Sequence, residues 1–182
     1  MVRKLKFNEQ KLLKKTDFIT WEADQQGKQS EVMRKYGVTK REHYALYNRL
    51  AAKTRELADK LKALPAGDGF RNEKTRELLG KLYALGIIPT ADTLENIGKM
   101  SGSSFARRRL PFVMKKTGMV PNVQQASDYV EQGHVRVGVN LVTDPAFLVT
   151  RNMQDSITWT RGSKIKAHVQ DYNNTRDDFD LA

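Results

Sequence analysis

Two different apolar periodicities divide this chain and set its fold class. From Tyr44 to Leu64, apolar residues recur three, four and seven positions apart in a stretch without proline or glycine. Further on, apolar and polar residues alternate from Val135 to Val137 and from Ile157 to Trp159. The first spacing is typical of amphipathic helices and the second of half-buried strands. The sequence therefore predicts an α+β protein: a helical N-terminal region, then a small domain of two helices and short antiparallel strands.

Helix-breaking residues indicate where the first helices end. One helix is expected over residues 41–64, followed by a turn in the run Pro65-Ala66-Gly67-Asp68-Gly69. A second, antiparallel helix is expected from about Asn72 to Leu85, closed by Gly86. Aromatic residues at helical spacing are more often core than base-stacking platforms. We therefore expect three tyrosines of this region in the core: Tyr44, Tyr47 and Tyr83.

The charge balance points to an anionic partner. The 182 residues include 32 Lys or Arg against 21 Asp or Glu, a net charge of +11. Such a positive field attracts phosphate, although a domain that is merely basic would have the same composition.

There is no cysteine, which excludes disulfides, thiolate zinc sites and a cysteine nucleophile and indicates an intracellular protein. No run approaches the ~20 apolar residues of a membrane span, and the start MVRKLKF lacks the apolar core of a signal peptide.

The densest positive charge lies in residues 107–116, where five residues are basic and none is acidic. An ordinary solvated helix face mixes signs, so this cluster predicts a phosphate-binding surface. A helix through Lys116, capped by Ser103 or Ser104, would stack cations seven residues and about 10 Å apart. These pairs would be Arg108 with Lys115 and Arg109 with Lys116. Pro111 conflicts with an unbroken helix, so the helix is expected either to start late or to bend.

The pattern after this cluster is helix, hairpin and a further strand. A helix is expected over about Val123 to Gln132, ending at Gly133, whose missing Cβ permits a left-handed turn. Alternation predicts a hairpin from Val135 to Val142. The strand around Ile157 to Trp159 precedes a basic turn, Arg161-Gly162-Ser163-Lys164.

These segments carry a resemblance to a known family. RRRLPFVMKKTGM and QASDYVEQGHVRVGVNLVTDPAFLV, within about 107–166, resemble the RNA-binding domain of the ribosomal protein S4 family, also called the alpha-L motif. YGVTKRE and the two following helices resemble its eukaryotic ribosomal member. Within the family, MVRKLKFNEQKLLKK, EQGHVRVG, LVTRNM and the terminal DDFD resemble the S4-type proteins of the U3 small nucleolar ribonucleoprotein. The resemblance covers essentially the whole chain.

The resemblance implies an RNA-binding assembly factor of the small-subunit processome, located in the nucleolus. It would help U3 small nucleolar RNA pair with pre-ribosomal RNA for processing of the pre-18S rRNA. The implied protein partners are an M-phase phosphoprotein scaffold and a Brix-domain processome protein. The alternative is a structural S4-type protein of the mature small ribosomal subunit, which would share the fold and the charge. The MVRKLKF start and the DDFD end favour the assembly factor.

An RNA face follows from the same resemblance. Its residues in this chain would be Arg107, Arg108, Arg109, Lys115, Lys116, His134, Arg136 and Asn140, and Lys164 of the basic turn completes the candidate set. Arginine forks onto phosphates and stacks on unpaired bases, whereas lysine supplies a point charge. His134 serves equally well as a structural hydrogen-bonder. The family hairpin commonly reads Val-Asn-Gly-Lys, whereas this chain has Val137-Gly138-Val139-Asn140 and lacks that lysine.

Four regions are expected: a basic N-terminal arm (1–40), a helical region (41–104), the S4-like domain (105–168) and an acidic tail (169–182). A thin apolar stripe at Leu5, Leu12 and Leu13 favours an arm that orders on contact, against a surface helix packed on its own domain.

Catalysis is not expected. S4-like domains are appended to pseudouridine synthases and tyrosyl-tRNA synthetases, but the roughly 100 residues upstream are too few for a catalytic domain. They contain no nucleotide-binding loop and no histidines at metal-ligand spacing. Three tail residues, Asp177, Asp178 and Asp180, could bind a cation, yet acidic tails are more often solvated or dock a partner. We therefore predict no catalytic residue, metal or cofactor.

Overall fold

The computed structural model describes residues 3–15 and 25–175. Parts of the expected arm and the acidic tail, with Asp177, Asp178 and Asp180, lie outside the described residues.

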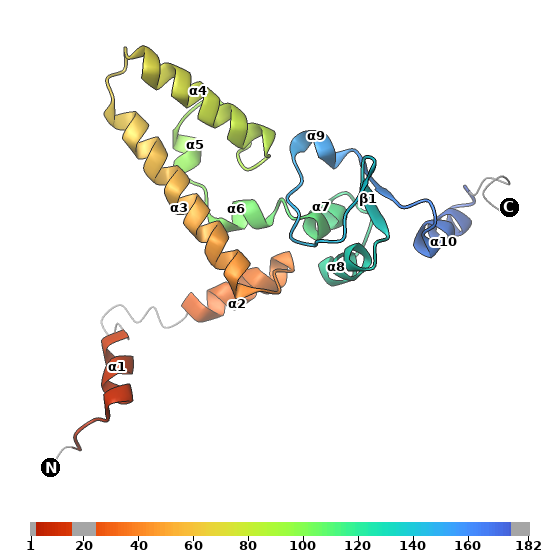
Figure 1. Ribbon diagram of the computed structural model, residues 1–182, viewed down its shortest axis with the longest axis horizontal. Helices are drawn as coiled ribbons and strands as arrows, with labels where there is room; N and C mark the ends of the chain where they lie inside the picture. The colour runs from red at the N-terminus through yellow and green to blue at the C-terminus, as the bar shows by residue number, and fades with distance from the viewer. Residues whose placement is uncertain (1–2, 16–24, 176–182) are drawn as a thin grey trace.

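Two assemblies of elements follow one another along the longest axis (Figure 1). The first contains α1 (Phe7–Lys15), α2 (Gln25–Tyr36), α3 (Arg41–Ala63), α4 (Gly69–Ala84), α5 (Glu95–Gly98) and α6 (Gly102–Ala106). The second contains α7 (Leu110–Lys116), α8 (Val123–Glu131), β1 (Val135–Val137), β2 (Asn140–Leu141), α9 (Arg151–Gln154), β3 (Ile157–Trp159) and α10 (Lys164–Tyr172).

The two predicted long helices are confirmed as α3 and α4, which form the arms of a V in Figure 1. α4 begins earlier than predicted because the Asp68 side chain accepts a hydrogen bond from the Phe70 N–H and caps the helix. Tyr47 is buried in the helical core and Tyr44 packs against it, as expected. Tyr83 is 41% exposed, so its predicted place in the core is wrong.

The second assembly has a core of its own. The sheet is antiparallel with the order β2-β1-β3, and Arg136 of β1 lies opposite Leu141 on one side and Thr158 on the other. Leu110, Val113 and Met114 of α7 pack with Val130 of α8 and with Val135 in this core. The expected helix, hairpin and strand are therefore confirmed. The hairpin turns at Gly138 and Val139, where Gly138 has a φ of +61° and Val139 is 95% exposed.

The expected single helix through Lys116 is wrong, and the late start is correct. Ser101 and Ser104 form a capping box that starts the short helix α6. Pro111 lies in the first turn of α7, where a missing N–H costs nothing. The three consecutive arginines thus form the connection between α6 and α7, and they are not stacked above Lys115 and Lys116 on one helix.

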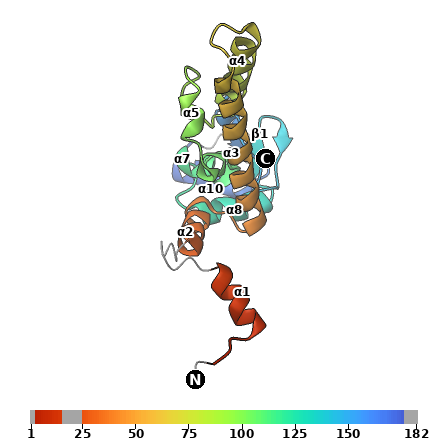
Figure 2. The same cartoon turned by 90° about the vertical axis from the view of Figure 1, so that its left-hand side faces the viewer.

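α1, at the N-terminal end of the described chain, extends away from the two cores (Figure 2). α1 buries none of its residues, and Phe7 is 76% and Leu12 65% exposed. Within the described ranges, no helix combines the length and the apolar character needed to cross a bilayer.

Two independent features restrict position 86 to glycine, and a substitution can test them. Its φ is +73°, and an added Cβ would lie 2.9 Å from Cζ of Arg108. Gly86→Ala should therefore destabilise the fold by about 1–2 kcal/mol or more, measured by urea unfolding.

Gly80 provides the matched control, because it lies inside α4 with nothing within 4 Å of an added Cβ. Gly80→Ala should stabilise the protein by about 0.5–1 kcal/mol. Equal stability of the two variants would contradict the packing of Arg108 over Gly86.

Candidate nucleic-acid interface

Arg109 is the most deeply buried of the three consecutive arginines, and only 1% of it is exposed. Its Nη1 donates to the hydroxyl of Tyr47 on α3 at 3.2 Å and lies 3.5 Å from Nδ1 of His43. Its backbone pairs with Leu148 of the second assembly. Arg109 therefore joins the two cores, and the expectation that it lies on an exposed basic edge is wrong.

Arg108 is buried as well, at 8% exposure. Its Nε donates to the Val149 carbonyl at 2.8 Å, and its Nη1 donates to Oε1 of Gln154 at 3.3 Å. Its Nη2 is buried and has no hydrogen-bond partner within the described part of the chain. Burial, and then repulsion from Arg151, lowers the pKa of the Arg108 guanidinium from its ordinary value. The expected pairing of Arg108 with Lys115 is also wrong.

A pocket of about 580 Å³ lies where the two cores meet, and Arg108 is part of its wall. The lining holds four cations and no carboxylate: Arg107, Arg108, Lys116 and Arg151. The loop 86–89 after α4 also lines it. We call this site the junction pocket. Four cations in one cavity repel one another, so an anion that enters it is favoured by all four.

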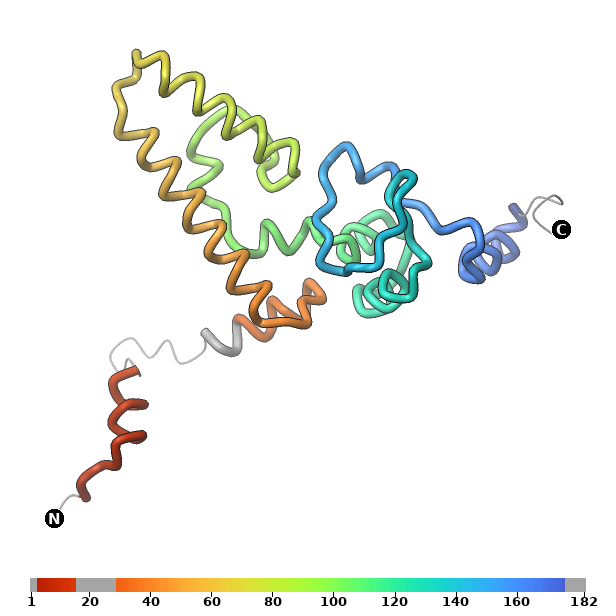
Figure 3. The backbone as a smooth tube through the Cα atoms, in the orientation of Figure 1, coloured from red at the N-terminus to blue at the C-terminus, as the bar shows by residue number. Residues whose placement is uncertain are grey.

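Arg151 is the residue that sequence reasoning missed. Its Nε donates to the Tyr83 carbonyl and its Nη2 to that of Ile88, both at 2.8 Å, while its guanidinium lies 4.1 Å from the centre of the Tyr83 ring. These contacts hold α9 beside the end of α4 (Figure 3). Arg151 stands alone in its segment, so no charge cluster pointed to it.

The other residues of the expected RNA face lie in several separate parts of the structure. Arg107 is exposed and donates from Nε to the Tyr36 hydroxyl at 3.2 Å, and Lys115 is exposed on α7. His134 is half-buried, with Nδ1 3.1 Å from Oγ of Ser163. Arg136 donates to the Thr158 hydroxyl at 2.9 Å. Asn140 and Lys164 are exposed at the starts of β2 and α10. Of the expected set, only Arg107, Arg108 and Lys116 line the junction pocket.

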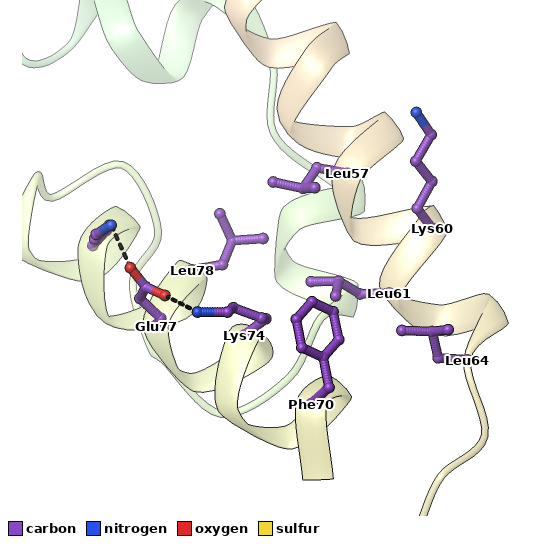
Figure 4. Close-up of a pocket in the computed structure, with 9 residues that line it drawn as sticks. Leu57, Lys60, Leu61, Leu64, Phe70, Lys74, Glu77 and Leu78 are labelled. Atoms are coloured by element: carbon purple, nitrogen blue, oxygen red, sulfur yellow. Dashed lines mark hydrogen bonds and ion pairs between the residues drawn. The ribbon is translucent and has the colours of Figure 1, made fainter. Parts of the chain in front are cut away.

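A second cavity, of about 490 Å³, opens between α3 and α4 and has a different character. Leucines and Phe70 line it, while Glu77 bridges Lys74 and Lys81 at 3.2 and 2.6 Å (Figure 4). Hydrogen bonds from these lysines lower the pKa of Glu77. Lys74 also pairs with Glu73 at 3.3 Å, so two carboxylates offset these two lysines and the groove is a poor site for phosphate.

Both parts of the chain match known families. Residues 4–105 match the ribosomal protein S4/S9 N-terminal domain, and residues 108–155 match the S4 domain. The two matches meet at the three consecutive arginines. The chain is thus built as an S4-type protein.

Full-length relatives refine this class. The chain is 66% identical to U3 small nucleolar ribonucleoprotein protein imp3 of Caenorhabditis elegans and 54% identical to IMP3 of Homo sapiens, each over 100% of this chain and 99% of the relative. It is 29% identical to small ribosomal subunit protein uS4 of Metallosphaera sedula, over 81% of this chain and 82% of the relative. The chain belongs to the ribosomal protein S4 family and, within it, to the U3 small nucleolar ribonucleoprotein protein imp3 group.

The different burial of neighbouring cations predicts different effects on stability. Arg109→Ala removes the bond to Tyr47 and leaves a cavity between the cores, so it should cost about 2 kcal/mol or more. Lys115→Ala changes an exposed side chain and should stay within about 0.5 kcal/mol of the parent protein. Urea unfolding followed by circular dichroism measures both. Equal stability of the two variants would show that Arg109 does not hold the cores together.

Proposed function

We propose that this protein is an RNA-binding assembly factor of the U3 small nucleolar ribonucleoprotein in the nucleolus, acting in the small-subunit processome. It would promote or stabilise the pairing of U3 small nucleolar RNA with pre-ribosomal RNA for processing of the pre-18S rRNA. The observation that carries the proposal is the junction pocket, with its four cations and no carboxylate. The relatives named as U3 small nucleolar ribonucleoprotein proteins support the choice of RNA.

The geometry supports a non-catalytic role in RNA pairing. Two RNA strands repel each other through their phosphates, and a cationic pocket that holds phosphates reduces this repulsion. Beyond their described hydrogen bonds, Arg107 keeps both Nη groups and Arg151 keeps Nη1, and these donors suit phosphates at junctions where shape is read. Arg109 links the two cores that meet at the pocket, which favours cations that need little rearrangement on binding.

Loss of phosphate contacts should appear in the salt dependence of RNA binding. Each contact removed from the junction pocket should lower the slope of log K against log salt by about 0.7–0.9. Lys116→Ala should therefore weaken RNA binding and reduce the slope by about 0.7–0.9, the amount expected for one phosphate contact. Fluorescence anisotropy with a U3–pre-rRNA junction RNA measures both.

Lys81→Ala is the matched control, because Lys81 is exposed but paired with Glu77 in the apolar groove. It should leave the slope unchanged. An equal loss of slope in both variants would reduce the interaction to a general attraction between the basic protein and RNA.

A structural protein of the mature small subunit is the second candidate, favoured by the similarity to uS4. Sedimentation of cell extracts distinguishes the two. An assembly factor should be confined to precursor particles, together with the M-phase phosphoprotein and Brix-domain partners that the resemblance implies. Presence on translating 40S and 80S particles would contradict the proposal.

The identity of the RNA can be tested directly in cells. Ultraviolet crosslinking followed by sequencing of the attached RNA should recover U3 small nucleolar RNA and the pre-ribosomal spacer. Recovery of mature 18S rRNA alone would favour the ribosomal alternative.

A further inference from the structure

A third pocket lies on a different surface, between β3 and α10. It has a volume of about 450 Å³, within the range of small-molecule sites. Met119 and Val169 contribute apolar walls, Trp159 contributes an indole ring, and Arg136 and Arg161 contribute guanidinium groups. No carboxylate of the described residues lines it. The residues matched by the S4 domain end at 155, so the pocket combines Met119 and Arg136 of the matched part with residues of β3 and α10 that follow it.

Trp159 is held in place from the side of the core. The Tyr129 ring meets it edge to face, with 5.9 Å between the ring centres. Trp159 is only half-buried, and it also lines the pocket. An indole fixed by one neighbour and open to a cavity can stack on a planar group without first losing conformational freedom.

The two arginines retain free donors. Arg136 uses Nε to donate to the Thr158 hydroxyl at 2.9 Å, which orients its guanidinium and leaves both Nη groups for another acceptor. Arg161 is exposed and has no hydrogen-bond or ion-pair partner in the described ranges. Two guanidinium forks without an acidic partner among the described residues, beside an indole, suit a ligand that is planar at one end and anionic at the other.

We propose that this β3–α10 pocket binds one unpaired nucleotide of single-stranded RNA. The base lies against Trp159 and the apolar walls, and the flanking phosphate accepts hydrogen bonds from Arg136 and Arg161. The proposal rests on the proposed RNA-binding function but places a separate contact outside the junction pocket. The alternative occupant is an acidic, aromatic peptide. The nucleotide is favoured because arginine forks match phosphate and the net charge of +11 draws polyanions.

Tryptophan fluorescence tests the proposal in the full-length protein. The chain has two tryptophans, so Trp21→Phe leaves Trp159 as the sole reporter. Titration with heptauridylate at physiological salt should quench Trp159 saturably, because stacking with a base quenches indole emission. In the same background, Arg161→Gln should weaken this binding at least threefold. Absence of quenching, or identical titrations of the parent and Arg161→Gln, would overturn the proposal.

Two further variants separate the possible failures. Lys60→Gln changes an exposed lysine on α3 that is paired with Glu56, and it should leave the titration unchanged. Arg107→Ala, in the junction pocket, should weaken binding of junction RNA yet preserve quenching by heptauridylate. The parent protein could bind no junction RNA while heptauridylate still quenched Trp159. That result would contradict the proposed function and support nucleotide binding in the β3–α10 pocket.

A second titration, with a peptide, distinguishes the two possible occupants of the pocket. An acidic, tryptophan-free peptide of alternating Asp and Phe should not quench Trp159 at concentrations where heptauridylate saturates. Quenching by the peptide and not by heptauridylate would overturn the nucleotide proposal in favour of a protein partner. Trp159→Phe, measured by anisotropy with labelled heptauridylate, should weaken binding. If this variant does not fold, Arg161→Gln still decides the proposal.

Discussion

The arrangement of the two cores depends on Arg109, a cation in the interior whose described neighbours are a tyrosine hydroxyl and a histidine ring. Burying a charge costs several kcal/mol, and here no described carboxylate offsets this cost through an ion pair. The position is therefore maintained by the surrounding packing, with Leu110 fully buried next to it and Val149 nearly so. Through Tyr47, Arg109 sets where α7 lies relative to α3. That placement in turn decides which cations meet at the junction.

The electrostatics of the junction pocket follow from this placement. Arg108 has a buried Nη2 without a described partner, and Arg151 lies close enough to lower the pKa of Arg108. Two arginines that repel each other in a partly desolvated cavity destabilise the empty state. On the proposed function, a phosphate bound in the pocket would reduce that repulsion. Three consecutive arginines thus have three roles: Arg107 faces the solvent and the pocket, Arg108 forms the wall, and Arg109 joins the cores.

Much of the fold could be predicted from the sequence, because periodicity and breakers act locally. The long helix α3, the C-terminal turn at Gly86 and the strand at Ile157 followed from spacing alone. The candidate site was predicted less well, since charge in a sequence does not show burial. Arg108 and Arg109 belong to a cluster that was expected to form an exposed phosphate-binding surface, and only long-range contacts with Val149 and Tyr47 reveal their structural role. Arg151 was missed because its partners, Tyr83 and Ile88, are more than 60 residues away.

The most direct test of this division of roles is an NMR titration that follows the Nε–Hε signals of the arginines while a U3–pre-rRNA junction RNA is added. The signals of Arg108 and Arg109 should exchange slowly with water before RNA is added, because both side chains are buried. On addition of RNA, the signals of Arg107 and Arg151 should shift, and that of Arg109 should stay in place. A shift of Arg109 comparable to that of Arg107, or rapid exchange of Arg109 in the free protein, would contradict the account.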